Sequence, residues 1–410
     1  MAVTRRTMLA APGALVAAAA QTDAPKRIAA IVTEYRKLSH ADVIVGKYLE
    51  GYNQDDQPPY PRSKIVSLFT EQVPATDLSR EKAARYGVPI HRSVRDALTL
   101  GTGKLAVDGV LLIGEHGEYP LNEKGQKLYP RYEMFLKVTD VFRENGRAVP
   151  VYSDKHLSWD WHQARRMVEI SRELRFPLMA GSSIPVAYRV PNHDVPYGAP
   201  VKHAVAISFG GIEAYGYHGM EGLQALIERR RGGETGIAAV QCLEDAACWR
   251  FLDANGWAAK LFDAALARSE GRKPGNPRDL VRKPAAFVVE YRDGATGVVF
   301  QMPGLLEEWV GAAEIEGQAQ PFSVLFKLQR FGVRHHFGCL VRNIEKMFET
   351  GKPAYPVERT LLTSGAMDYL MESRFKGNIR IETPEMAVRY TPARGPCYCE
   401  KGWSADGKLL

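Results

Sequence analysis

The chain has 410 residues, of which 45% are hydrophobic and 25% charged, and its formal net charge is +7. This is the composition of a globular protein with room for two or three domains, and it excludes collagen-like, coiled-coil and low-complexity proteins. The Lys and Arg residues are scattered, and we interpret the densest run, residues 228–231, as a solvated helix end. Without a basic patch, nucleic acid is not an expected partner.

The first twenty residues differ from the rest of the chain. Arg5 and Arg6 precede an Ala-rich apolar run from Met8 to Ala20. Paired arginines before a short, weakly hydrophobic run that ends in small residues are typical of a twin-arginine export signal. The run is also shorter than the roughly 20 apolar residues that cross a membrane. We therefore expect residues 1–20 to be a signal peptide, and the mature protein to be periplasmic or otherwise exported, without a membrane span.

The cysteines allow disulfides but do not suggest a metal site. There are five, so at least one thiol has no partner within the chain. Cys242 and Cys248 lie on one predicted helix and are poorly placed to pair, whereas the state of Cys397 and Cys399 is left open. Cys397 and Cys399 have no second cysteine pair and no histidine at the spacing of zinc ligands, so we expect no structural zinc.

In the first half of the chain, short apolar runs alternate with amphipathic stretches. The predicted strands span residues 27–33, 64–69, 87–90, 107–113, 149–152 and 177–180, and the predicted helices span residues 39–48, 77–86, 94–98, 129–144 and 159–174. Such alternation is typical of a doubly wound parallel sheet with right-handed crossovers, a Rossmann-like α/β domain. We assign it residues 26–185.

The pattern changes near residue 200. Further strands are predicted at residues 204–208, 285–291, 297–302, 310–316 and 322–327, and helices at residues 219–230, 343–350 and 360–374. Asp293-Gly294 marks a hairpin turn, which favours a mixed, largely antiparallel sheet. We assign residues 186–390 to an α+β domain, with residues 391–410 as a C-terminal tail; the family resemblance described below implies that this domain serves substrate binding and oligomerisation. The last two helices should return to the first domain.

Ligands of a doubly wound sheet bind at the carboxyl ends of its strands. At those ends the sequence carries Thr33, Glu71, the pair Glu115-His116, and the triplet 154–156. The polar run around Glu115 and His116 could hold a metal or a ligand hydroxyl, and we predict no metal there. We interpret His335 and His336 as structural.

Five short motifs resemble one known family. They are Ala84-Arg-Tyr-Gly-Val-Pro, Val107-Asp-Gly-Val-Leu-Leu-Ile with His116 after it, Asp154-Lys155-His156 in place of Glu-Lys-Pro, Gly216-Tyr217-His218-Gly219-Met220-Glu221 in place of Asp-x-Gly-x-His-x-x-Asp, and Phe348-Glu-Thr-Gly-Lys-Pro. Their order and spacing over roughly residues 26–390 resemble the glucose–fructose oxidoreductase / inositol dehydrogenase (Gfo/Idh/MocA) family.

The chain departs from this family at the first turn. The family's first strand leads into Gly-x-Gly-x-x-Gly, which lets the backbone approach a pyrophosphate at a helix N-terminus. Residues 33–40 contain no glycine here. Any phosphate would have to be held by side chains such as Arg36, Lys37 and Ser39. The chain is therefore identified as an atypical member.

The resemblance implies a tightly bound NAD or NADP. The residues at the matching places are Thr33, Ser39, Glu71, Glu115 and His116. Glu71, just after the second strand, is placed to contact a ribose hydroxyl, which favours NAD. In this family the mixed sheet often forms subunit contacts, so the resemblance also implies a homo-oligomer.

The resemblance further implies two proton-handling residues. Lys155 matches the lysine that lies between cofactor and substrate, where an amine can hold a hydroxyl or assist proton transfer. His218 would be the general acid/base, since the pKa of an imidazole suits this role. Glu221, one helical turn on, would orient His218. The expected substrate contacts are Asp154, His156, Tyr217 and Glu221.

Three functions follow as hypotheses. The leading one is an exported enzyme, an NAD(P)-dependent oxidoreductase that moves hydride between the cofactor and a hydroxyl of a sugar, cyclitol or glycoside. The second keeps the carbohydrate site but is redox-neutral, with transient oxidation that permits elimination or hydrolysis. The third is a non-catalytic ligand-binding protein that has lost the cofactor with the glycine motif.

Overall fold

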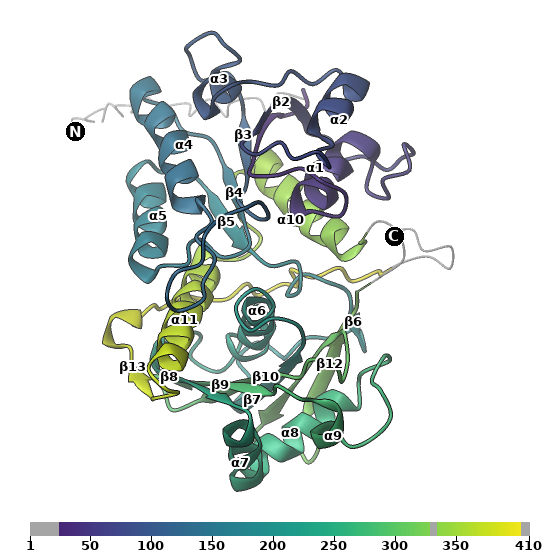
Figure 1. Ribbon diagram of the computed structural model, residues 1–410, viewed down its shortest axis with the longest axis vertical. Helices are drawn as coiled ribbons and strands as arrows, with labels where there is room; N and C mark the ends of the chain where they lie inside the picture. The colour runs from purple at the N-terminus through teal and green to yellow at the C-terminus, as the bar shows by residue number, and fades with distance from the viewer. Residues whose placement is uncertain (1–23, 329–333, 403–410) are drawn as a thin grey trace, which may run out of the picture.

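The computed structural model describes residues 24–328 and 334–402 (Figure 1). The predicted export signal lies outside the described residues. Within them, no helix is both long enough and apolar enough to cross a membrane.

The first sheet has five parallel strands in the order β2-β1-β3-β4-β5. Its strands are β1 (Arg27–Val32), β2 (Lys64–Thr70), β3 (Gly109–Ile113), β4 (Val151–Asp154) and β5 (Leu178–Gly181). The predicted doubly wound sheet is confirmed. The predicted strand at residues 87–90 is wrong: only an isolated bridge between Ile90 and Leu68 forms there.

Helices cover both faces of this sheet. They are α1 (His40–Glu50), α2 (Ser79–Tyr86), α3 (Val94–Thr99), α4 (Arg131–Asn145), α5 (Trp161–Glu173) and α10 (His336–Thr350). Because side chains alternate along a strand, Ala29 and Ile31 of β1 pack in the core with α3, α4 and α5. Ile28 and Ala30 pack instead with α1 and α10. Helix α10 thus returns to the first domain as predicted (Figure 1).

The second sheet has eight strands in the order β13-β8-β9-β10-β7-β11-β12-β6. They are β6 (Arg189–Val190), β7 (Val201–Ser208), β8 (Ile237–Glu244), β9 (Ala285–Tyr291), β10 (Thr296–Gln301), β11 (Trp309–Ile315), β12 (Phe322–Phe326) and β13 (Ile381–Glu382). Strands β7 and β10 pair in parallel, and the other pairs are antiparallel. The predicted mixed, largely antiparallel sheet is confirmed.

Helices also cover both faces of the second sheet. On the side of the first domain lie α6 (Gly216–Ile227) and α11 (Val357–Phe375) (Figure 1). On the far side lie α7 (Ala246–Ala254), α8 (Gly256–Leu266) and α9 (Pro277–Leu280) (Figure 1). The short helix η1 (Pro384–Met386) follows β13.

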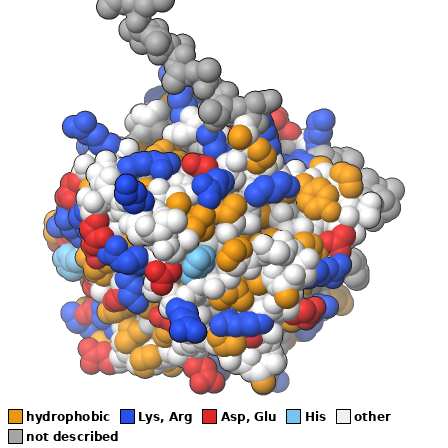
Figure 2. Space-filling model, turned by 90° about the horizontal axis from the view of Figure 1, so that it is seen from above, with side chains coloured by type: hydrophobic (Ala, Val, Ile, Leu, Met, Phe, Trp, Pro, Cys, Tyr) orange, Lys and Arg blue, Asp and Glu red, His pale blue; other side chains and the backbone are white. Residues whose placement is uncertain are grey.

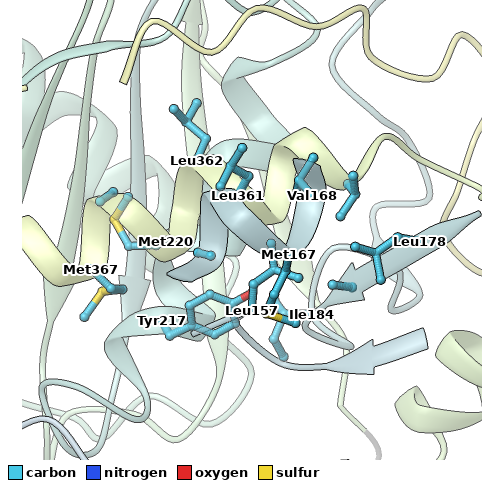
Figure 3. Close-up of a cluster of buried hydrophobic side chains, with 14 of the residues drawn as sticks. Leu157, Met167, Val168, Leu178, Ile184, Tyr217, Met220, Leu361, Leu362 and Met367 are labelled. Atoms are coloured by element: carbon cyan, nitrogen blue, oxygen red, sulfur yellow. The ribbon is translucent and has the colours of Figure 1, made fainter. Parts of the chain in front are cut away.

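One apolar cluster joins the two sheets. Met167 of α5, Met220 of α6 and Leu362 of α11 are each fully buried in it (Figure 3). Leu178 of β5 belongs to the same cluster (Figure 3). Because protein interiors of this kind are close-packed, the cluster holds the two sheets in a fixed position relative to each other.

One expectation about polar residues is corrected. The run at residues 228–231 is no solvated helix end, because Glu228 forms a buried ion pair with Arg359 at 2.5 Å and Arg230 pairs with Glu234 at 3.0 Å. On the face in Figure 2, acidic and apolar side chains lie between the basic ones.

The cysteine assignments also change. Cys242 lies on β8 and Cys248 on α7, so they do not share a helix. Cys339 of α10 and Cys399 form a disulfide, which ties the C-terminal segment to the first domain. Cys397 is a free thiol.

Candidate functional site

A cleft of about 720 Å³ lies between the two sheets. Its first wall is formed by residues that follow β1, β3 and β4, among them His40, His116 and Lys155. Its second wall includes His218 of α6 and Trp309 of β11. The carboxyl ends of the parallel strands therefore open onto this cleft, as the sheet topology predicts.

Lys155 and His218, the two residues predicted to handle protons, both line this cleft. They lie on opposite domains, and the charge on Lys155 contributes to lowering the pKa of His218. The two side chains therefore line one cleft from different domains.

A buried carboxylate holds the Lys155 side chain. The Lys155 amine donates to Glu115 at 2.7 Å, and the other Glu115 oxygen accepts from Arg131, whose side chain is fully buried. Burial alone would raise the pKa of Glu115, but Lys155 and Arg131 outweigh it and hold this pKa well below its usual range. Glu115 is therefore ionised and fixes the amine at the cleft wall.

Backbone strain gathers at the same place. Leu38, His116 and Lys155 have φ angles of 60°, 71° and 64°, and all three line the cleft. They follow β1, β3 and β4 respectively. The left-handed region costs a non-glycine residue about 1 kcal/mol or more and is enriched at functional sites. This is the behaviour expected of a ligand site at a sheet edge.

His218 stands in the first turn of α6, with its ring edge-on to Trp309 and Tyr215. Its Nδ1 atom lies 2.5 Å from the Ser182 hydroxyl. Burial, followed by the charge on Lys155, lowers the pKa of His218 well below the usual value. His218 is therefore neutral near pH 7.

Glu221 supports His218 only indirectly, through Ser182. Its carboxylate accepts from the Ser182 amide at 3.1 Å and from the Thr363 hydroxyl at 2.6 Å. Its side chain is fully buried, and burial raises its pKa. The prediction that Glu221 contacts the substrate is corrected. Glu221 instead accepts from the amide of Ser182, whose hydroxyl lies beside the His218 ring.

The sequence hypothesis did not single out His40. This first residue of α1 lines the cleft, and its Nδ1 atom lies 2.6 Å from the carboxylate of Asp154, the last residue of β4. The two residues are separated by 114 positions. Only the polar strand end at Asp154 was visible in the sequence; its partner was not.

Three predicted substrate contacts lie behind the cleft wall. Asp154, His156 and Tyr217 are 1%, 5% and 1% exposed and do not line the main cleft. The His156 Nε2 atom lies 3.0 Å from the Arg131 guanidinium. Of the three, Asp154 holds a group that faces the cleft, the His40 imidazole. By contrast, His336, which we expected to be structural, lines the cleft.

Most of the predicted cofactor residues also lie away from the cleft. Thr33 is buried and donates to the Glu115 carbonyl at 2.9 Å, and Ser39 is buried as the N-cap of α1. Glu71 accepts from the Tyr119 hydroxyl at 2.5 Å. Only Glu115 and His116 of the five line the cleft, and burial lowers the pKa of His116 to about 3.

The adenosine half of a dinucleotide does not fit this conformation. The Leu38 amide, just before α1, already donates to the Asp42 carboxylate at 2.9 Å, so a negative charge occupies the helix N-terminus where a pyrophosphate would lie. Residues 116–119 reach across to the end of β2, where Tyr119 binds Glu71 and the Glu118 amide donates to Gln72 at 2.8 Å. The other half of the dinucleotide path, beside His116 and Lys155, opens into the cleft.

Within residues 24–328 and 334–402, no group of three or more His, Cys, Asp or Glu side chains is arranged to hold a metal ion.

Comparisons with known proteins agree with the fold. No protein-family model matches the sequence, and no curated protein matches it either. The solved structure of GenD2 from gentamicin A biosynthesis in complex with NAD superposes with a TM-score of 0.56 at 12% identity, over 88% of this chain and 97% of that one. Apo scyllo-inositol dehydrogenase from Lactobacillus casei gives 0.55 at 11% identity, over 88% and 98%.

An NAD-binding oxidoreductase from Klebsiella pneumoniae gives a TM-score of 0.52 at 13% identity, over 87% of this chain and 98% of that one. At these identities the likeness establishes the fold. The chain shares the two-domain fold of these three structures, and the resemblance seen in its motifs is confirmed at the level of the fold.

Proposed function

We propose that the protein is an oxidoreductase that acts on a hydroxyl of a sugar, cyclitol or glycoside in the cleft between its two sheets. One observation carries this proposal: the Lys155 amine and the His218 imidazole come from different domains and line one cleft. Solved structures that share the fold include an inositol dehydrogenase and an NAD complex, which supports the reaction class.

The residues of the cleft suit a polyhydroxylated ligand. Lys155 and the neutral His218 offer hydrogen bonds to hydroxyl oxygens, and Tyr215 and Trp309 present stacked rings 6.0 Å apart on the second wall. Aromatic faces beside polar groups are a common surface for sugar binding. The ionised Glu115 holds the Lys155 amine at the cleft wall, where it can stabilise a developing alkoxide.

A nicotinamide nucleotide, NAD or NADP, is the proposed hydride acceptor. When bound it would supply the redox chemistry. The open half of its path lies beside His116 and Lys155, and Arg36 and Lys37 are the cations on the cleft wall nearest to the first turn. The contact between Tyr119 and Glu71 closes the adenosine half of this path.

The same closure favours a second candidate. A chain that fills the adenosine site with its own side chains could bind a carbohydrate without a cofactor, as a ligand-binding protein. The Glu118–Gln72 and Tyr119–Glu71 contacts are the specific support for it.

Export by the twin-arginine route is part of the proposal, and it rests on the paired arginines Arg5-Arg6. Twin-arginine export moves folded proteins and suits one that takes up its cofactor first. The resemblance to the family by itself suggests a homo-oligomer, but α8 covers the far face of the second sheet, which argues against pairing through that sheet.

The decisive experiment starts from the exported protein. After denaturation, the released small molecules are examined for nicotinamide by absorbance and fluorescence. Stoichiometric nicotinamide, with reduction of it by a sugar or cyclitol, supports the oxidoreductase, and nicotinamide without net reduction points to redox-neutral chemistry. No released nicotinamide and no binding of added NAD(H) or NADP(H) would reject both enzymes in favour of the ligand-binding protein.

The Lys155→Ala variant tests the site itself. We expect turnover to be abolished while the melting temperature is nearly unchanged, because Glu115 keeps its partner Arg131. Lys137→Ala, on the exposed face of α4 away from the cleft, is the control. Retained turnover in Lys155→Ala would remove Lys155 from the chemistry.

A further inference from the structure

We propose that His40, oriented by Asp154, is the base that takes the proton from the substrate hydroxyl, and that His218 serves as a neutral hydrogen-bond donor to the same substrate. This assignment rests on the proposed function for the identity of the substrate. It differs from the sequence hypothesis, which gave the base role to His218.

The partner of each histidine fixes where its proton lies. An ionised carboxylate only accepts hydrogen bonds, so the 2.6 Å contact with Asp154 places a hydrogen on Nδ1 of His40. The lone pair is then on Nε2. In the described part of the chain no residue hydrogen-bonds to this atom, and the ring lines the cleft. His40 therefore presents an acceptor to a ligand.

His218 has the opposite arrangement. The Ser182 hydroxyl oxygen accepts from the Ile184 amide at 3.1 Å and lies 2.5 Å from Nδ1 of His218. Nδ1 of His218 is the one acceptor that the described residues offer to the hydroxyl hydrogen. Ser182 thus donates to His218, and the ring carries its own hydrogen on Nε2. Among the described residues no carboxylate contacts this ring.

The carboxylate also makes His40 the better base. When the substrate O–H bond breaks, its electron pair stays on oxygen and the proton goes to Nε2 of His40. The resulting imidazolium is stabilised by the Asp154 carboxylate, whose side chain is only 2% exposed. A protonated His218 would have only a hydroxyl beside it. The alkoxide oxygen can then be held by the amine of Lys155.

The fold builds this dyad from two strands that flank β3. His40 is the first residue of the helix that follows β1, and Asp154 is the last residue of β4. Phe337 packs edge-on to the His40 ring at 5.0 Å, and His116 lies edge-on at 5.3 Å. These contacts leave little freedom for the imidazole to turn away from Asp154.

The tautomers can be read directly, without any substrate. Full-length protein labelled with ¹⁵N-histidine is compared with Asp154→Asn, His40→Gln and His218→Gln, which assign the ring signals, at a pH where both rings are neutral. We expect His40 to carry its hydrogen on Nδ1 and His218 on Nε2. In Asp154→Asn the His40 ring should shift toward the Nε2–H form while His218 is unchanged. A wild-type His40 protonated on Nε2, or a tautomer indifferent to Asp154→Asn, would overturn the proposal.

Kinetics separate the two histidines. With a sugar or cyclitol that the wild type turns over, His40→Gln should lower kcat about 100-fold or more with little change in KM, the size expected for loss of a general base. His218→Gln should mainly change KM. The control His162→Gln, on the exposed face of α5, should change neither kcat nor KM. The reverse pattern would overturn the proposal.

Failure of the proposed function looks different. If no carbohydrate is turned over and no nicotinamide binds, the reaction class is wrong, but the ring tautomers still decide whether Asp154 makes His40 the acceptor of the cleft.

Discussion

The Lys155 amine donates to the Glu115 carboxylate at 2.7 Å, and the two residues come from the ends of neighbouring strands. Because Arg131 holds the other oxygen of Glu115, the carboxylate remains fixed when Lys155 is replaced. The amine can therefore be removed without leaving an unpaired buried charge. This property separates the role of Lys155 in catalysis from its role in stability.

Backbone strain at Lys155 should be measurable with two variants that both lack the amine. Since φ is 64° there, Lys155→Gly relieves the left-handed strain and Lys155→Ala keeps it. Despite glycine's entropic cost, we expect Lys155→Gly to be more stable by about 1 kcal/mol in urea unfolding. The same exchange at Lys137, within α4, is the control and should favour alanine instead. Equal stabilities of the Lys155 pair would argue against strain at this position.

The Tyr119 hydroxyl should restrain the adenosine end of the cofactor path. Tyr119→Phe removes its hydrogen bond to Glu71 and frees this carboxylate. One such bond is worth about 1 kcal/mol, so the Kd for NADH should fall roughly five-fold. Titration calorimetry measures it, with Tyr60→Phe, at an exposed tyrosine, as the control. An unchanged Kd would show that this contact does not restrict the path.

Lys47 should make stability depend on pH in the alkaline range. Burial lowers its pKa to about 7, whereas the unfolded chain has an ordinary lysine pKa near 10.4. Between these values the unfolded state binds more protons, so the free energy of unfolding rises with pH. From pH 7.5 to 9.5 the wild type should gain about 2 kcal/mol relative to Lys47→Met, because each pH unit in this window is worth up to about 1.4 kcal/mol.

Urea unfolding at several pH values tests this, with Lys64→Met, at an exposed lysine, as the control. The Lys64 variant should follow the wild type across the range. If Lys47→Met also followed it, Lys47 would have to be charged in the folded protein.

The second sheet should not pair with a second copy of the chain. Val205 and Phe300 on its far face are buried with Leu261 and Phe262 of α8. The apolar surface that a sheet-to-sheet dimer needs is therefore already covered. Contrary to the expectation from the family resemblance, light scattering should give a monomer near 45.6 kDa before any signal removal. A concentration-independent dimer would contradict this prediction.

Much of the first sheet could be predicted because local patterns specify it. The run at residues 107–113 is apolar throughout, which is typical of a strand buried on both faces, and β3 is buried along its whole length. The Asp293-Gly294 turn likewise gave the β9–β10 hairpin correctly. The strand predicted at residues 87–90 failed because too few backbone pairs form around Ile90.

The sequence by itself determined the two sheets, the strand ends that carry polar residues, and the candidacy of Lys155 and His218. Only the tertiary structure decided which polar residues face the cleft. Asp154 reads as a ligand contact but is buried as the partner of His40, 114 positions away, and Glu71 reads as a ribose contact but binds Tyr119. Periodicity and propensity act over a few residues, whereas a hydrogen bond between distant segments exists only once packing has fixed both of them.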